Sequence, residues 1–293
     1  MITPNQHDAG AIDASNGRNL SRRIASALVL APIGLIAAYF GGWLFLVACA
    51  LAAGVILWEW TALVVRNADP YVLALGLTAL LAAAVLAGAS EPVAAVAAIA
   101  AGTVLAGGAM AAWPGRYPAA DLALWGAGGV IYAGIVLLSP VLLRADPEFG
   151  FAALLFLFAT VWATDVFAYL VGRKAGGPLL WPQVSPNKTW SGAIGGLGGG
   201  VAAGTLVAYA SGGTKPVAAG VLALVLSIVA QGGDLFESAV KRRFDAKDAG
   251  SLIPGHGGVM DRLDGFLFAA LAALLIGIVR QGMAAPARGL LVW

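Results

Sequence analysis

The sequence is poor in charge. Only 11% of its 293 residues are Asp, Glu, Lys or Arg, whereas 60% are hydrophobic and the mean hydropathy is +0.87. Soluble proteins carry about a quarter charged residues, and a chain this apolar would expose large apolar patches in water. The net charge of +2 is too small to indicate a nucleic-acid partner. We therefore expect a membrane protein with the lipid bilayer as its solvent.

Cysteine and histidine are also scarce. The single cysteine, Cys49, lies in an apolar run and cannot form an intrachain disulfide, so nothing requires an oxidising compartment. His256 has neither a cysteine nor a second histidine near it in the sequence, which makes it a poor zinc ligand. The polar first 20 residues do not resemble a secretory signal.

Long apolar runs, in contrast, fill the chain. A helix crosses a bilayer with roughly 20 mostly apolar residues, and this criterion gives about nine candidates. They are 24–40, 43–65, 71–88, 93–112, 121–143, 151–171, 190–210, 216–240 and 263–282. The predicted fold class is all-α, a polytopic integral membrane helix bundle. We expect a disordered polar tail over 1–20, N-terminal transmembrane helices over 21–145 and a second transmembrane region over 146–293.

The basic residues predict the orientation. With the N-terminus in the cytoplasm, the 17 Lys and Arg residues fall on the cytoplasmic side except for Arg144, Lys215, Arg280 and Arg288. Two long polar loops, 172–189 and 241–262, then lie on the same cytoplasmic face, where they can meet.

Few charged residues lie within the spans, and each costs about 2.5–3.5 kcal/mol at membrane depth. They are Glu59, Asp165, Asp234, Glu237 and Asp264. Glu59 is either an interfacial residue or a functional one, and the sequence does not decide between them.

Asp234 and Glu237 share one face of the eighth span with Ser238 and Lys241, at positions i, i+3, i+4 and i+7. Glu237 and Lys241 could equally form a simple ion pair. Asp261 and Asp264 stand three residues apart at the start of the ninth span, where acidic residues also favour a helix N-terminus. Together with Asp234 they suggest a site for a hard metal ion, since Mg²⁺ prefers oxygen ligands.

The other loop offers Ser185, Lys188 and Thr189 just before the seventh span. Hydroxyls and amides at a helix start suit phosphate binding, although ordinary N-capping is the alternative for both hydroxyls. The glycine-rich run over 192–200 lacks the spacing of a nucleotide-binding loop and is interpreted as a helix-packing face.

Residues 238–264, SAVKRRFDAKDAGSLIPGHGGVMDRLD, resemble the C-terminal motif of phosphatidate cytidylyltransferases, also called CDP-diacylglycerol synthases. Gly233 to Ser238 and Ser185 to Gly192 are similar to further segments of that family, and the resemblance extends over about residues 155–275. Ser191 departs from it, because many members carry Glu there. The motif positions present are Ser238, Lys241, Arg242, Lys247, Asp248, Pro254, His256, Gly257, Gly258, Asp261, Arg262 and Asp264.

The resemblance implies that CTP and phosphatidic acid react to give CDP-diacylglycerol and pyrophosphate, with Mg²⁺ or a pair of metal ions. It makes 146–293 the catalytic region of a bacterial-type inner-membrane enzyme, for which a homodimer is a candidate assembly. The implied catalytic residues are Asp234, Lys241, Arg242, Lys247, Asp248, His256, Asp261 and Arg262. The implied nucleotide-binding residues are Ser185, Lys188, Thr189, Gly257 and Gly258, and the metal ligands are Asp234, Asp261, Asp264 and Asp165. His256 is expected to orient a phosphate or a carboxylate rather than to act as a base.

Two other readings stay open. A related CTP-using membrane enzyme could accept an isoprenoid-based lipid or phosphorylate a lipid alcohol. Carboxylates within spans also occur in cation-coupled transporters, but here they gather at one membrane face and in loops rather than at the midplane.

Overall fold

The computed structural model describes residues 31–65, 69–117, 120–212, 215–250, 252 and 257–293. Within these ranges, eight helices are long and apolar enough to cross a membrane, which confirms the predicted helix bundle. They are α2 (Gly42–Val65), α3 (Pro70–Gly88), α4 (Pro92–Ala112), α5 (Ala120–Arg144), α6 (Gly150–Ala175), α7 (Trp190–Ala210), α8 (Pro216–Arg243) and α9 (Met260–Gln281). A short helix, α10 (Pro286–Leu291), follows them.

The first expected span, 24–40, is described only in part. An apolar helix covers Ala31–Phe40, and the rest of that span lies outside the described residues, as does the tail over 1–20. The helix ends where Gly41 and Gly42 have φ values of +63° and +52°. This left-handed backbone is accessible mainly to glycine, so the Gly-Gly pair separates this helix from α2.

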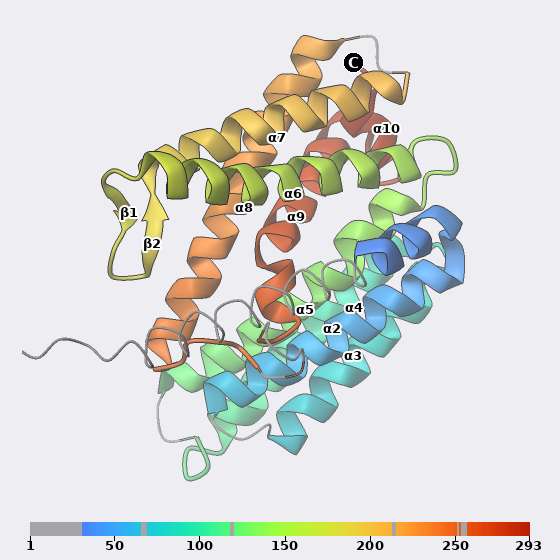
Figure 1. The fold of residues 1–293 in the computed structure, drawn as a ribbon. Helices are drawn as coiled ribbons and strands as arrows, with labels where there is room; N and C mark the ends of the chain where they lie inside the picture. The colour runs from blue at the N-terminus through green and yellow to red at the C-terminus, as the bar shows by residue number, and fades with distance from the viewer. Residues whose placement is uncertain (1–30, 66–68, 118–119, 213–214, 251, 253–256) are drawn as a thin grey trace, which may run out of the picture.

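One element is not expected from the sequence. Between α6 and α7 lies an antiparallel hairpin of β1 (Leu179–Trp181) and β2 (Ser185–Thr189), in which Leu179 pairs with Thr189 and Trp181 with Ser185. The stretch predicted as a loop over 172–189 therefore consists of the last turn of α6 and this hairpin (Figure 1). The hairpin fixes where the side chains of β2 point.

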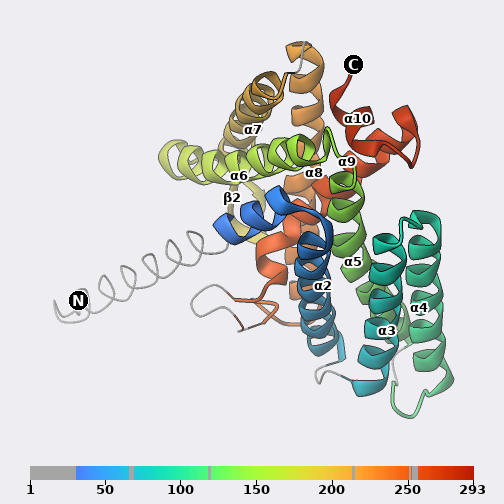
Figure 2. The same ribbon diagram turned by 90° about the vertical axis from the view of Figure 1, so that its right-hand side faces the viewer.

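The helices form two groups (Figures 1 and 2). Helices α2 to α5 pack on one another, helices α6 to α9 form the second group with the hairpin, and α5 and α9 are in contact between them. Helices α6 and α7 pack closely because α7 presents glycine to α6. A Cβ atom at Gly196 would lie 2.8 Å from the Thr164 carbonyl oxygen, and one at Gly200 would lie 2.3 Å from Thr164 Oγ1. Such small-residue contacts are typical of helices packed in lipid.

Ion pairs join separate elements at both ends of the bundle. At one end, Arg243 at the end of α8 lies 2.7 Å from Asp121 at the start of α5, and Arg116 lies 2.7 Å from Asp69. At the other end, Arg288 lies 2.6 Å from Glu148. The end that carries Arg243 also carries the segment between α8 and α9, so the motif residues lie at one end of the bundle.

Candidate active site

A cleft of about 690 Å³ opens between α6, the hairpin, α7, α8 and α9. Its volume lies within the range of small-molecule sites. Eight residues predicted from the sequence line it together: Asp165, Ser185, Lys188, Thr189, Asp234, Asp261, Arg262 and Asp264. The structure thus brings the two polar loops to one site.

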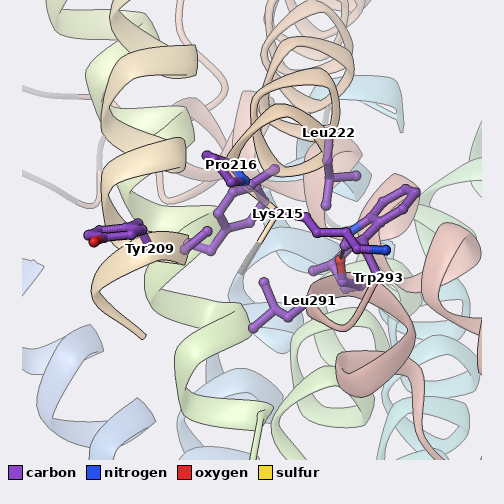
Figure 3. A pocket seen from close by; sticks show the side chains of 10 residues that line it. Tyr209, Lys215, Pro216, Leu222, Leu291 and Trp293 are labelled. Carbon is purple, nitrogen blue, oxygen red and sulfur yellow. Dashed lines mark hydrogen bonds between the residues drawn. The ribbon is translucent and has the colours of Figure 1, made fainter. Parts of the chain in front are cut away.

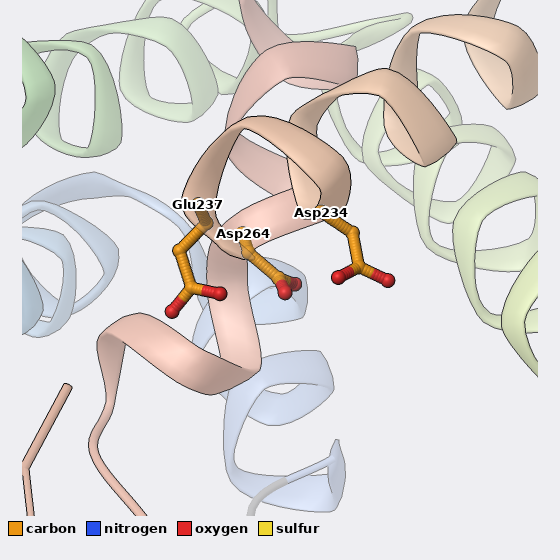
Figure 4. A group of neighbouring side chains, drawn as sticks. All are labelled: Asp234, Glu237 and Asp264. Carbon is orange, nitrogen blue, oxygen red and sulfur yellow. The ribbon is translucent and has the colours of Figure 1, made fainter. Parts of the chain in front are cut away.

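Three carboxylates lie close together here, of which Asp234 and Asp264 line the cleft and Glu237 is buried and outside its lining. Asp234 and Glu237 of α8 and Asp264 of α9 each place an oxygen within 4.8 Å of the others (Figure 4). Two of them, Asp234 and Asp264, were predicted as metal ligands, and Glu237 was not. A donor set made only of carboxylate oxygens suits a hard divalent cation.

Glu237 is fully buried, and Lys241 Nζ lies 2.7 Å from its Oε2 atom. The ion pair expected one helical turn apart is therefore present. Neither Glu237 oxygen has a hydrogen bond of regular geometry within the described part of the chain. A buried carboxylate in this state has bonding capacity left for a ligand.

Asp261 has different partners. Its Oδ1 atom lies 2.6 Å from Lys241 Nζ, and its Oδ2 atom accepts hydrogen bonds from the amides of Ala249 at 3.0 Å and Gly258 at 2.7 Å. These bonds tie the α8–α9 segment to the start of α9. Among the described residues, Asp261 is not part of the three-carboxylate group, although it borders the cleft. Asp165 likewise borders the cleft outside that group.

Lys188 reaches the site from β2 and forms an ion pair with Asp234 Oδ2. The Ser238 hydroxyl lies 3.5 Å from the other oxygen of Asp234. The hairpin therefore places an ammonium group directly beside the carboxylates of α8.

The hydroxyl residues differ from each other in role. Thr189 caps α7, because its Oγ1 atom accepts a hydrogen bond from the Gly192 amide at 3.1 Å. Thr189 is therefore the N-cap of α7, and its predicted contact with the nucleotide stays a prediction, while Ser185 lies at the start of β2. Ser191, the residue that departs from the family pattern, donates a hydrogen bond to the Gly176 carbonyl and so ties α7 to the end of α6.

Other predicted residues do not border the cleft. Arg242 donates to the Ala246 carbonyl at 3.0 Å, and Lys247 and Asp248 are exposed. Gly257 and Gly258 surround the Asp261 carboxylate in the segment before α9. His256 lies outside the described residues, so its predicted role stays a prediction.

Several cleft residues were not assigned from the sequence. Arg173, Asn187 and Gln231 line it, and Tyr169 accepts a hydrogen bond from Arg173 at 2.8 Å. Asp165, Tyr169 and Arg173 are spaced by four residues on α6, so this helical spacing is the sequence signal that could have found Tyr169 and Arg173.

A second hollow lies between the end of α7, the start of α8 and the C-terminal residues (Figure 3). It measures about 10 Å³ and is lined mainly by apolar side chains such as Leu222, Leu291 and Trp293. It has room for one water molecule at most, so the larger cleft is the candidate site.

Comparison with known proteins gives one family. The sequence pattern of the cytidylyltransferase family matches residues 21–279. A phosphatidate cytidylyltransferase of Brucella abortus is 56% identical over 155 residues, which cover 53% of this chain and 57% of the relative. Proteins of the same name are 38% identical over 139 residues in Bacillus subtilis (47% of this chain, 52% of the relative) and 45% identical over 121 residues in Staphylococcus aureus (41% and 46%). The chain thus spans about half the length of the curated relatives that it matches.

Proposed function

The chain belongs to the cytidylyltransferase family, and on this premise we propose that it transfers the cytidylyl group of CTP to phosphatidic acid. The products are CDP-diacylglycerol and pyrophosphate, and the reaction serves phospholipid biosynthesis. The names of the relatives support the choice of lipid. The observation that carries the proposal is the cleft in which carboxylates of α8 and α9 meet the cations Lys188 and Arg262.

The proposed reaction joins two anions. A phosphate oxygen of the lipid attacks the α-phosphorus of CTP, the bond from that phosphorus to the bridging oxygen breaks, and its electron pair leaves with pyrophosphate. The attacking phosphate is already ionised at neutral pH, so the step needs no general base. Repulsion between the reactants and charge on the leaving group are the obstacles that the site must offset.

Mg²⁺ bound at Asp234, Glu237 and Asp264 would supply positive charge to the phosphates. The fit rests on the donor set: three carboxylates within reach of one ion, one of which has buried oxygens without regular hydrogen bonds. We assign Asp165 the role of orienting the groups that surround that ion, because it borders the cleft but is not one of the three clustered carboxylates.

The cations have different assignments. Lys188 and Arg262 border the cleft and are proposed to neutralise the triphosphate and the leaving pyrophosphate. The side chain of Lys241 is only 12% exposed and contacts both Glu237 and Asp261. We therefore assign Lys241 to holding these two carboxylates in place. The hydroxyl of Ser185, which lines the cleft, is proposed to bind the nucleotide or the lipid headgroup.

The proposed location follows from the substrates. CTP is cytosolic, and phosphatidate keeps its headgroup at the membrane surface while its acyl chains stay in the bilayer. A cleft with basic residues at the cytoplasmic face of the inner membrane gives access to both. The excess of Lys and Arg in the segments assigned to that face supports this orientation.

Turnover with a panel of acceptors tests the proposal. Purified protein in detergent is given labelled CTP with phosphatidate, diacylglycerol or an isoprenoid phosphate, each with Mg²⁺ or with EDTA. We expect CDP-diacylglycerol from phosphatidate alone, and only with the metal. Transfer to the isoprenoid phosphate, or phosphorylation of diacylglycerol, without CDP-diacylglycerol would overturn the proposed acceptor.

A further inference from the structure

Glu59 is a fully buried carboxylate on α2 that the proposed reaction does not use. Its Oε1 atom accepts a hydrogen bond from the Val259 amide at 2.9 Å, and its Oε2 atom accepts one from the Met260 amide at 2.7 Å. The first amides of a helix have no partner inside that helix, so they need acceptors from elsewhere. Glu59 supplies two acceptors to the start of α9 across 200 residues of sequence.

Two glycines that precede α9, Gly250 and Gly258, lie against this carboxylate. A Cβ atom at Gly258 would lie 2.5 Å from Glu59 Oε1, and a Cβ atom at Gly250 would lie 2.7 Å from the same oxygen. Neither contact leaves room for a side chain. Glycine at these two positions therefore allows the backbone to approach Glu59.

The contact fixes the turn of α9 that faces the cleft. The amide of Gly258 donates to Asp261, and the next two amides donate to Glu59, so two carboxylates hold three successive N–H groups. Arg262 and Asp264, both cleft residues, follow within four residues of Met260. A shift of this turn would move Asp264 relative to Asp234.

Helix α2 is itself held firmly next to Glu59. Trp60 Nε1 donates to the Trp125 carbonyl of α5 at 2.8 Å, and the Trp60 ring centroid lies 4.9 Å from that of Tyr132. The Tyr132 ring in turn lies 6.2 Å from Phe268 of α9. Glu59 thus neighbours a series of aromatic contacts that joins α2, α5 and α9.

We propose that Glu59 is a positioning residue, which holds the first turn of α9 so that Asp264 stays beside Asp234 and Glu237. The inference rests on the proposed function and extends the site to the N-terminal group of helices. Outer residues that orient metal ligands change metal affinity or activity by about 10- to 100-fold when they are mutated.

The variants Glu59→Ala and Glu59→Gln test this, with Thr61→Val as the matched control. Thr61 is a buried polar residue of the same helix, and its hydroxyl donates to the Leu57 carbonyl within α2 at 2.7 Å. Three quantities are measured in detergent: hydrogen exchange of the peptide that contains Val259 and Met260, affinity for Mn²⁺ by electron paramagnetic resonance, and turnover.

For Glu59→Ala we expect exchange of that peptide to accelerate at least about tenfold and Mn²⁺ affinity and kcat to fall by roughly 10- to 100-fold. Glu59→Gln preserves the volume and one acceptor oxygen, so its losses should be intermediate, and Thr61→Val should behave as the wild type. Wild-type exchange and Mn²⁺ binding in Glu59→Ala, or equal losses in Thr61→Val, would overturn the inference. Exchange and Mn²⁺ binding need no turnover, so a wild-type protein without cytidylyltransferase activity would refute the proposed function and leave this test intact.

Discussion

The two groups of helices treat their carboxylates differently. In the α2–α5 group, the buried acids have fixed partners: Glu59 binds two backbone amides, and Asp69 binds Arg116 and the start of α3. In the α6–α9 group, Asp234, Glu237 and Asp264 each place one carboxylate oxygen within 4.8 Å of the others. In the first arrangement each carboxylate is satisfied on its own, whereas in the second three carboxylates lie close enough to share one cation, although Lys188 and Lys241 pair with two of them. This difference in carboxylate partners is what the following predictions test.

The largest effect is expected from changing a carboxylate of that cluster. Asp234→Asn and Asp264→Asn keep the side-chain volume but remove one charge each, and we expect turnover to fall on the order of 10²- to 10³-fold. Formation of labelled CDP-diacylglycerol is the measurement. Glu148→Gln, which changes a carboxylate at the opposite end of the bundle, is the control and should retain wild-type turnover. Near wild-type rates in both Asp variants would remove the distinction between the two groups.

Lys188→Met should have a smaller effect that depends on the nucleotide. A hydrogen bond to a charged group contributes about 1.5–3 kcal/mol, so the KM for CTP should rise roughly 10- to 100-fold. Lys188 also contacts Asp234, so its removal should strengthen Mn²⁺ binding in the absence of CTP. Lys174→Met, a change of an exposed cation at the end of α6, is the control. An unchanged KM with unchanged Mn²⁺ affinity would contradict the role assigned to Lys188.

In the α2–α5 group the expected effects concern stability. Burial alone would raise the pKa of the Asp69 carboxyl, but hydrogen bonds from Arg116 and from the α3 amides hold this pKa below its usual value. A lowered pKa in the folded state means that the carboxylate stabilises the protein above the pKa of the unfolded chain, about 3.9. This contribution is lost as the pH falls further, through the folded-state pKa.

Asp69→Ala should therefore lower the unfolding free energy at pH 7 by about 1–2 kcal/mol, because it removes both the cap and the ion pair. Asp69→Asn keeps a capping oxygen and should cost less than about 1 kcal/mol, similar to Arg116→Gln. Thermal unfolding in detergent at pH 7 and pH 3 measures the difference from the wild type. The cost of Asp69→Asn should shrink at pH 3, and a cost that grows there would contradict the assignment.

The smallest effect is expected for Arg288→Gln. Its partner Glu148 is 64% exposed and Arg288 is 49% exposed, and such surface pairs contribute less than about 1 kcal/mol. Turnover should be unchanged and the melting temperature nearly so. A large loss of activity would show that the far end of the bundle takes part in the reaction.

The helices were predictable because their apolar runs match the thickness of a bilayer and end at Pro, Gly or charged residues. The hairpin was not, because strands of three and five residues with Pro182 between them leave no periodic pattern. The contact of Lys188 with Asp234 depends on this hairpin, so it could not be predicted from the sequence either.

The site residues show the same limit. The motif spacing predicted Asp234, Asp261 and Asp264 as metal ligands. Only the directions of the side chains show that Glu237 lies with Asp234 and Asp264. Asp261 instead contacts Lys241 and two backbone amides. Glu59 remained undecided in the sequence because its partners lie 200 residues away. A contact at that separation has no local signature in a single chain.

The fate of the CTP phosphates distinguishes cytidylyl transfer from phosphorylation of the lipid. Purified protein with Mg²⁺ and phosphatidate is given CTP labelled at either the α- or the γ-phosphate, and the lipid and aqueous products are separated. We expect the α-label in the lipid and the γ-label in pyrophosphate. A γ-label in the lipid would identify a kinase, and no label in the lipid from either position would contradict cytidylyl transfer to phosphatidate.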